Sequence, residues 1–168
     1  LLTLGQYEEG FLQYEWRLRK SNPGYDVQSL RNIVPDVSSL QGSKVQIVYE
    51  QGLGDVIMFM RYALELIGRD IPVSMVVPKE VLEIARTLDP RLEILGPDDK
   101  RPPADFILPM MSLPMIVGTQ LDSVPNELSY IQVDSKKARI WKEHLKDSVK
   151  PKVGLVVTGS MVHDNDHN

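Results

Sequence analysis

Polar residues and glycines that could do chemistry gather in one short stretch, YEQGLGDVIMFMRY, at residues 49–62. Its site candidates are Glu50, Gln51, Gly52, Gly54 and Asp55. The two glycines allow a sharp turn between an apolar run and the helix that we expect to begin beside Asp55. A carboxylate presented on such a turn is suited to accepting hydrogen bonds from the hydroxyl groups of a ligand.

Glycine loops of this kind often hold phosphate, but the other residues that phosphate binding needs are absent. A P-loop requires Lys and then Ser or Thr after its glycines, whereas Asp55 follows Gly54. The dinucleotide fingerprint requires a third small residue where Ile57 stands, and an acid after the next strand, where the chain reads PK. At a generic anion site, Asp55 would itself supply the negative charge. We therefore expect the loop to offer a ligand a fixed carboxylate.

Structural roles compete with ligand binding at each candidate. Asp is a favoured helix N-cap, and this role is compatible with ligand binding because a cap uses one carboxylate oxygen. Glu50 is either paired with a nearby Lys or Arg or is a second contact to the ligand. Ser112, in the apolar loop LPMMSLP, is expected to cap a short helix, and this loop either lines the pocket or packs in the core. Arg61 is expected either to snorkel to the surface or to pair across a helix face.

Strands and helices alternate around the loop. The runs KVQIVYE, VSMVV, RLEIL and DFILP predict four strands, and helices are predicted over residues 56–67 and 79–88. This alternation implies an α/β fold with a Rossmann-like parallel sheet and right-handed crossovers. Ligands of such sheets bind beyond the carboxyl ends of the strands, where residues 50–55 fall.

An amphipathic helix is predicted ahead of the sheet, at residues 1–22. Its apolar face would carry Leu4, Tyr7, Phe11, Tyr14 and Leu18. Its polar face would carry Glu8, Glu9, Arg17 and Lys20. A single helix cannot bury such a face alone, so we expect it to lie on the following domain or on further repeat helices.

The remaining chain divides into three parts. Residues 23–43 are expected to form a linker, residues 44–150 a Rossmann-like domain, and residues 151–168 the start of a second domain. The segment SKKARIWKEHLKDS predicts a helix with Ser135 as its N-cap, and KVGLVVTG predicts one more strand at residues 153–158. Because the chain begins without Met inside a helical pattern, we expect it to be a piece of a longer protein.

Composition excludes several classes of protein. The 168 residues are 42% hydrophobic and 25% charged, which is typical of a globular domain. The net charge of -4 gives no basic face for nucleic acid, and no apolar run reaches the roughly 20 residues of a membrane span. With no cysteine, the chain has no disulfide or thiolate site, which fits a cytoplasmic location.

The tail HDNDHN contains residue types that bind metals, namely His163, Asp164, Asp166 and His167. It lacks the glycine and the distal Glu of a calcium loop and the helical spacing of a zinc site. We therefore expect a solvated loop here, and we expect neither a metal nor another cofactor in the protein.

Several motifs together resemble proteins that join tetratricopeptide repeats to a domain like the ADP-heptose:lipopolysaccharide heptosyltransferases. The resemblance runs through most of the chain, and the order and spacing of its motifs make it specific. The matching stretches are LGQYEEGFLQYEWRLR, EQGLGDVIMFMRY, ADFILPMMSLP, SYIQVD and KVGLVVTGSMVHDNDHN. The family has the GT-B fold of two facing Rossmann domains, so the resemblance implies that this chain is the last repeat helix and the N-terminal domain.

The resemblance also implies a function. In the heptosyltransferases the first domain holds the acceptor, and an Asp just after its first strand is the proposed general base, a role that falls on Asp55 by motif match. Glu50, Gln51, Gly52, Gly54 and Ser112 would then contact the acceptor. The partners implied are a nucleotide-sugar donor, bound mainly by the second domain, and a glycan or protein acceptor. The present chain should therefore be inactive by itself. The alternative is a non-catalytic repeat-linked module that binds a glycan or protein.

Overall fold

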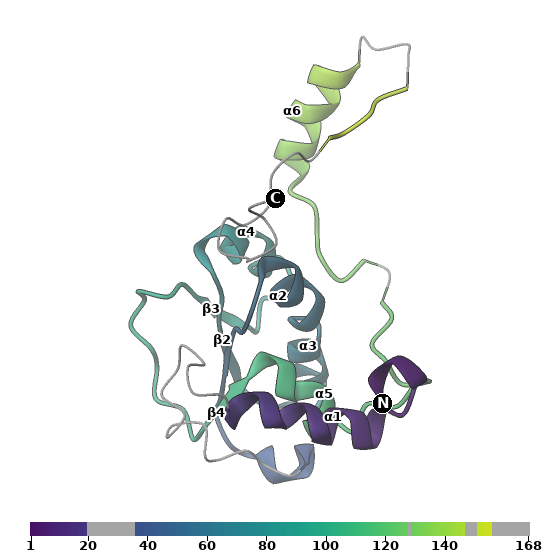
Figure 1. Cartoon of the computed structure of the whole chain (residues 1–168). Helices are drawn as coiled ribbons and strands as arrows, with labels where there is room; N and C mark the ends of the chain where they lie inside the picture. The colour runs from purple at the N-terminus through teal and green to yellow at the C-terminus, as the bar shows by residue number, and fades with distance from the viewer. Residues whose placement is uncertain (20–35, 128, 147–150, 156–168) are drawn as a thin grey trace. The chain divides into compact units, whose positions relative to one another are not determined.

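The computed structural model describes residues 1–19, 36–127, 129–146 and 151–155. The chain divides into two compact units, Leu1–Gln132 and Val133–Asn168. The first unit contains the sheet and the helices around it (Figure 1).

A four-stranded, all-parallel sheet forms the centre of the first unit. Its strands are β1 (Val45–Val48), β2 (Val73–Val76), β3 (Glu93–Leu95) and β4 (Phe106–Pro109). Their order in the sheet is β3-β2-β1-β4. All four predicted strands are present, and the α/β, Rossmann-like fold with a parallel sheet is confirmed.

One face of the sheet carries most of the core. Alternate strand residues such as Ile47, Met75 and Leu108, each 0% exposed, pack against apolar residues of the helices. The opposite face holds a smaller cluster of Val48, Val76 and Leu95. Every residue of β1 and β2 is buried on one face or the other, which agrees with the largely apolar character of these strands, interrupted by the buried Gln46 and Ser74.

The helix expected at residues 56–67 forms as two short helices. These are α2 (Leu53–Phe59) and α3 (Tyr62–Ile67), which follow one another along the sheet (Figure 1). The helix expected at residues 79–88 is also shorter, with a 3₁₀ turn η5 (Lys79–Val81) followed by α4 (Leu82–Ala85). After β4 come the 3₁₀ turn η6 (Met110–Ser112) and α5 (Leu113–Ile116).

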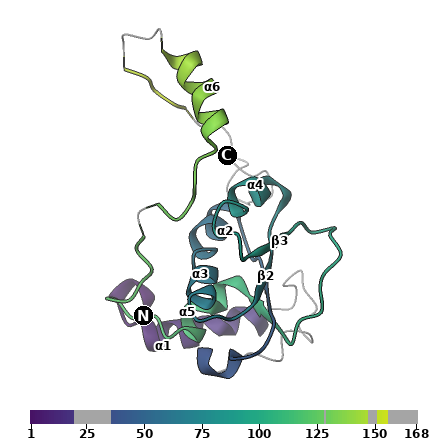
Figure 2. The same ribbon diagram turned by 180° about the vertical axis from the view of Figure 1, so that it is seen from behind.

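The N-terminal segment is not one continuous helix, and that expectation is wrong. It consists of η1 (Leu2–Leu4), α1 (Tyr7–Tyr14) and η2 (Glu15–Arg19). Gly5 separates the first two pieces, with a φ of 74° that an L residue rarely adopts. As a result Leu4 is 75% exposed and does not belong to the buried face. The segment packs on its own domain, where α1 lies alongside α5 in both views (Figures 1 and 2).

The described part of the expected linker also carries structure. Residues 20–35 lie outside the described part of the chain, and η4 (Val37–Leu40) follows. Asp36 caps this turn by accepting the backbone N–H of Ser38 at 2.8 Å and of Ser39 at 3.3 Å. Leu40 is 0% exposed, so residues 37–40 are anchored in the core.

The second unit contains the helix α6 (Ser135–Leu145). Its N-cap is Asp134 and not Ser135, because the Asp134 carboxylate accepts the N–H groups of Lys137 and Lys136 at 3.0 and 2.7 Å. These hydrogen bonds lower the pKa of Asp134. The strand expected at residues 153–158 is absent from its described part, residues 153–155, and the remainder lies outside the described residues.

The core identified here predicts which leucines matter for stability. We expect Leu108→Ala, which empties a fully buried site between the sheet and the helices, to lower the free energy of unfolding by about 2–5 kcal/mol. The matched control is Leu121→Ala, because Leu121 is 68% exposed and its loss should cost less than about 0.5 kcal/mol. Urea unfolding of both variants makes the comparison. Equal losses would contradict the assignment of Leu108 to the core.

Candidate functional site

The sheet has a topological switch point between β1 and β4. The chain passes from β1 to β2 and β3 on one side, and then returns to place β4 on the other side of β1. The segments that leave the carboxyl ends of β1 and β4 therefore diverge, which is where doubly wound sheets form a ligand crevice. Glu50 follows β1 at this point, and Met111 and Ser112 follow β4.

The guanidinium group of Arg17 fills the space between these two strand ends. Its Nε donates to Glu50 Oε1 at 3.0 Å, and its Nη2 donates to Glu50 Oε2 at 2.9 Å. Nη2 also donates to Ser112 Oγ at 2.8 Å. Nη1 donates to Glu15 Oε1 at 2.6 Å and to the carbonyl oxygen of Tyr14 at 3.3 Å. All five N–H groups of the guanidinium thus have an acceptor.

The acceptors around Arg17 are themselves fixed by further bonds. Ser112 Oγ donates to Glu15 Oε2 at 2.7 Å, and the backbone N–H of Met111 donates to Glu50 Oε2 at 3.0 Å. The side chains of Arg17 and Glu50 are 11% and 5% exposed, so this is a buried ion pair. We call Arg17, Glu15, Glu50 and Ser112 the Arg17 cluster.

The Arg17 cluster keeps its guanidinium charged. Burial alone would lower the pKa of Arg17, but the hydrogen bonds and charges of Glu50 and Glu15 outweigh it and raise this pKa above its ordinary value. One cation faces two carboxylates, so neither Glu50 nor Glu15 is buried without a counter-charge. This arrangement meets the requirement that buried charges be both paired and hydrogen-bonded.

The loop after Glu50 turns through an unusual backbone conformation. Gln51 has a φ of 58°, in the left-handed region that non-glycine residues rarely adopt. Its side-chain Nε2 donates to the hydroxyl of Tyr14 at 3.0 Å. Gly52 and Gly54 follow, both exposed, and the chain enters α2 at Leu53. The turn brings the backbone of residues 51–54 to the surface at the carboxyl edge of the sheet.

Asp55 lies in the first turn of α2, and the expectation that it is the N-cap is wrong. Gly52 is the N-cap residue, and Asp55 Oδ2 accepts its backbone N–H at 3.1 Å. The carboxylate therefore closes the turn from the third helical position, as the acid of a capping box does. Its other oxygen, Oδ1, accepts no hydrogen bond from the described residues, and Asp55 is partly exposed.

The structure separates the sequence-predicted candidates into two groups. Gln51, Gly52, Gly54 and Asp55 form an exposed or partly exposed loop at the strand end. Glu50 lies beneath it and forms an ion pair with Arg17, which is the first of the two roles expected for this residue. Ser112 is 0% exposed, and it precedes α5 without capping it because its hydroxyl belongs to the Arg17 cluster.

Sequence reasoning missed Arg17 by placing it on the polar face of the N-terminal helix. The signal was present in the spacing, because Arg17 follows Tyr14 by three residues and precedes the buried Leu18. The structure explains the change of face, since residues Glu15–Arg19 form a 3₁₀-helix. Tyr14 is the last residue of α1, directly before this 3₁₀-helix, and the guanidinium of Arg17 stacks over the Tyr14 ring, 4.7 Å from its centroid.

The structure also shows the environments of Met58 and Arg61, which lie near the loop. The helical spacing of Met58, Phe59, Tyr62 and Leu66 predicts a buried apolar stripe. Tyr62 and Leu66 are buried, but Met58 is 49% exposed, so the prediction is wrong for Met58. Arg61 donates to the carbonyl oxygens of Met58 and Pro125, each at 3.0 Å, and stacks on the Tyr130 ring at 4.4 Å. Arg61 thus anchors a backbone segment.

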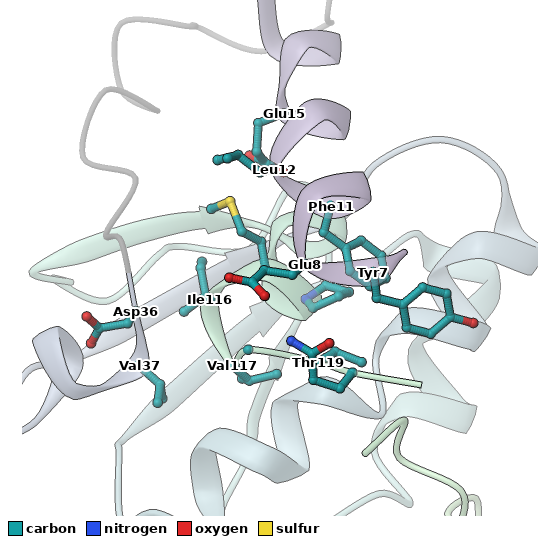
Figure 3. A pocket seen from close by; sticks show the side chains of 14 residues that line it. Tyr7, Glu8, Phe11, Leu12, Glu15, Asp36, Val37, Ile116, Val117 and Thr119 are labelled. Atoms are coloured by element: carbon teal, nitrogen blue, oxygen red, sulfur yellow. The ribbon is translucent and has the colours of Figure 1, made fainter. Parts of the chain in front are cut away.

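An apolar groove lies between α1 and the segment that begins with α5 (Figure 3). Its volume is about 650 Å³, and its lining includes Tyr7 and Phe11 of α1 together with Ile116 and Val117. Glu8 and Asp36 add carboxylates to its lining. The groove meets the Arg17 cluster only at Glu15, and it does not include the Gln51–Asp55 loop.

The part of the chain that the structure describes contains no group of three or more side chains arranged to hold a metal ion. The tail residues with metal-binding chemistry, at positions 163–167, lie outside it. Within the same described ranges, no helix combines the length and apolar character needed to cross a membrane.

Comparisons with known proteins give no family for the chain. No protein-family model matches it, and neither curated proteins nor solved structures give a significant match.

The buried pair predicts a large cost when Glu50 loses its charge. We expect Glu50→Gln to lower the free energy of unfolding by about 3 kcal/mol, at the low end for a broken buried ion pair because Glu15 still faces Arg17. Asp98→Asn is the control, since Asp98 forms an exposed ion pair with Lys79 at 2.7 Å and its loss should leave the urea midpoint unchanged. A loss below about 1 kcal/mol for Glu50→Gln would show that the pair is dispensable.

Proposed function

We propose that the chain is the acceptor-binding half of an inverting glycosyltransferase. The observation that carries this proposal is the glycine turn at the carboxyl end of β1, which presents the partly exposed Asp55 carboxylate beside the switch point of a parallel sheet. The sequence resemblance to the heptosyltransferases supports the same assignment. The transferred sugar would come from a nucleotide-sugar donor.

Asp55 is suited to act as a general base. One carboxylate oxygen is held by the backbone N–H of Gly52, which fixes the orientation of the group, and Oδ1 remains available to a ligand among the described residues. In the proposed reaction Oδ1 takes the proton of an acceptor hydroxyl. The acceptor oxygen then bonds to the anomeric carbon from the face opposite the nucleotide, which leaves with the electron pair of the broken C–O bond. The configuration at that carbon is inverted.

The acceptor would lie on the exposed part of the loop. Gln51 offers a side-chain amide and the backbone of Gly52 and Gly54 can be approached closely because neither has a side chain. Glu50 and Ser112 are also expected from the sequence to contact the acceptor, but both form hydrogen bonds to Arg17 within the Arg17 cluster. In this proposal they support the loop from below and do not touch the acceptor.

The donor would bind to a second domain across the cleft, as it does in GT-B enzymes. No described residue group in this chain supplies the Lys, Ser or Thr of a phosphate-binding glycine loop, and Asp55 would repel a phosphate at the loop itself. Because the donor phosphates would bind to the other domain, an acidic loop is compatible with the acceptor side. The chain by itself should then bind an acceptor but transfer nothing.

A binding module without catalysis is the second candidate. The apolar groove between α1 and α5 favours it, because about 650 Å³ of apolar-lined space next to the carboxylates Glu8 and Asp36 could take part of a glycan or protein partner. In this case Asp55 would serve only to close the first turn of α2. Transfer assays on variants of Asp55 distinguish the two functions.

We expect Asp55→Asn to abolish transfer while leaving the fold intact. Asn keeps the size of the side chain and can still accept the Gly52 N–H, so the free energy of unfolding should change by less than about 1 kcal/mol. The transfer rate should fall by roughly 100-fold or more, because the amide cannot take the acceptor proton. The measurements are a urea unfolding curve and a sugar-transfer rate, the latter in a protein that carries both domains.

The chain offers a closely matched control in Asp99. Its Oδ2 accepts the backbone N–H of Gly96, three residues earlier, at 2.8 Å, which is the same local contact that Asp55 makes with Gly52. Gly96 follows β3, two strands away from β1 in the sheet. Asp99→Asn should leave transfer unchanged. A parental transfer rate in Asp55→Asn would show that Asp55 is only a helix-capping residue.

A further inference from the structure

The N-terminal segment contacts the Gln51–Asp55 loop from two directions. Tyr14 accepts a hydrogen bond from the Gln51 side chain at 3.0 Å, and Arg17 binds both carboxylate oxygens of Glu50. Tyr14 and Arg17 are in turn held together, because the guanidinium lies 4.7 Å above the centre of the Tyr14 ring. One rigid pair of side chains thus holds two consecutive residues at the start of the loop.

The backbone of the loop needs such support. A non-glycine residue in the left-handed region costs free energy and persists only where its surroundings fix it, and Gln51 has a φ of 58°. On its amino side, Glu50 is fixed by Arg17 and by the N–H of Met111. On its carboxyl side, Gly52 donates to Asp55. The conformation of Gln51 therefore sets the direction in which α2 begins and Asp55 points.

We infer that Arg17 is a positioning residue of this site, which holds Glu50 and Tyr14 so that the Gln51–Gly52 turn stays closed and Asp55 is presented in one orientation. The effect of Arg17 on the transfer rate rests on the proposed function. Its effect on the Gln51–Gly52 turn does not, because the turn is a property of the loop itself. It makes the N-terminal segment part of the site. A change in the position of η2 would move Glu50 and Gln51 together.

An ordinary structural role for Arg17 makes a different prediction. If the Arg17 cluster only stabilised the fold, substitutions would lower the unfolding midpoint without changing the order of one loop in the folded protein. The distinguishing readout is therefore the backbone order of residues 51–54 in the native state. NMR relaxation of the backbone amides measures it residue by residue.

The test compares Arg17→Lys with the parent chain. Lysine keeps the charge but loses the planar fork that reaches Glu50, Ser112 and the Tyr14 carbonyl at once. We expect the order parameters of the Gln51 and Gly52 amides to fall from about 0.85 to below about 0.6, while that of Ile47 in β1 stays high. Tyr14→Phe, which removes one hydroxyl and keeps the ring, should loosen Gln51 to a smaller extent.

Arg61→Lys is the matched control, because Arg61 also stacks on a tyrosine and donates to backbone carbonyls, but at Pro125 and Met58. It should leave residues 51–54 ordered. Arg17→Ala adds a rescue experiment, in which millimolar guanidinium chloride, far below denaturing concentrations, should restore the order of the turn and sodium chloride should not. If Arg17→Ala does not fold, Arg17→Lys decides the question alone.

The transfer assay separates this inference from the proposed function. In a protein with both domains, Arg17→Lys should lower kcat by roughly 10- to 100-fold with the KM for the donor unchanged, because the base is misplaced and the donor site is not. A loosened turn together with full transfer in Asp55→Asn would overturn the proposed function and leave the positioning role intact. A turn that stays ordered in Arg17→Lys would overturn the inference, whatever Asp55 does.

Discussion

A buried guanidinium group is stable only where each of its N–H groups meets an acceptor and its charge meets an opposite charge. Arg17 meets this condition through five hydrogen bonds to Glu50, Ser112, Glu15 and the Tyr14 carbonyl. These acceptors come from three parts of the chain, the N-terminal segment and the ends of β1 and β4. All five N–H groups find acceptors only when these three parts of the chain lie together around the guanidinium. The arrangement at the carboxyl edge of the sheet therefore depends on the burial of Arg17.

The same interaction accounts for the contrast between the inside and the outside of the loop. Glu50 points inward and is neutralised by a cation, whereas Asp55, five residues later, is partly exposed with one oxygen held by the Gly52 backbone. The left-handed Gln51 and the glycines between them allow the chain to reverse over this short distance. Two acids in one motif thus have opposite environments, and only the outer one is open to a ligand.

The sequence predicts the sheet well because its strands are buried and apolar. The runs around Ile47, Met75 and Leu108 identify strands without knowledge of the rest of the chain. The shorter helices, such as α4, are harder to predict because long-range packing decides where they end. The burial of Arg17 is harder to predict than the strands, because its partners Glu50 and Ser112 are 33 and 95 residues away and because a 3₁₀ turn changes the face on which it lies.

The sequence separation within the Arg17 cluster has a consequence for the order of events during synthesis. Ser112 follows Arg17 by 95 residues, so a ribosome that adds about 5–20 residues per second needs roughly 5–20 s to supply this partner. Until β4 has joined β1, the guanidinium has no crevice to enter, and it stays hydrated on a segment that cannot yet dock. The N-terminal segment, although translated early, is therefore expected to be among the last parts of the unit to reach its native position.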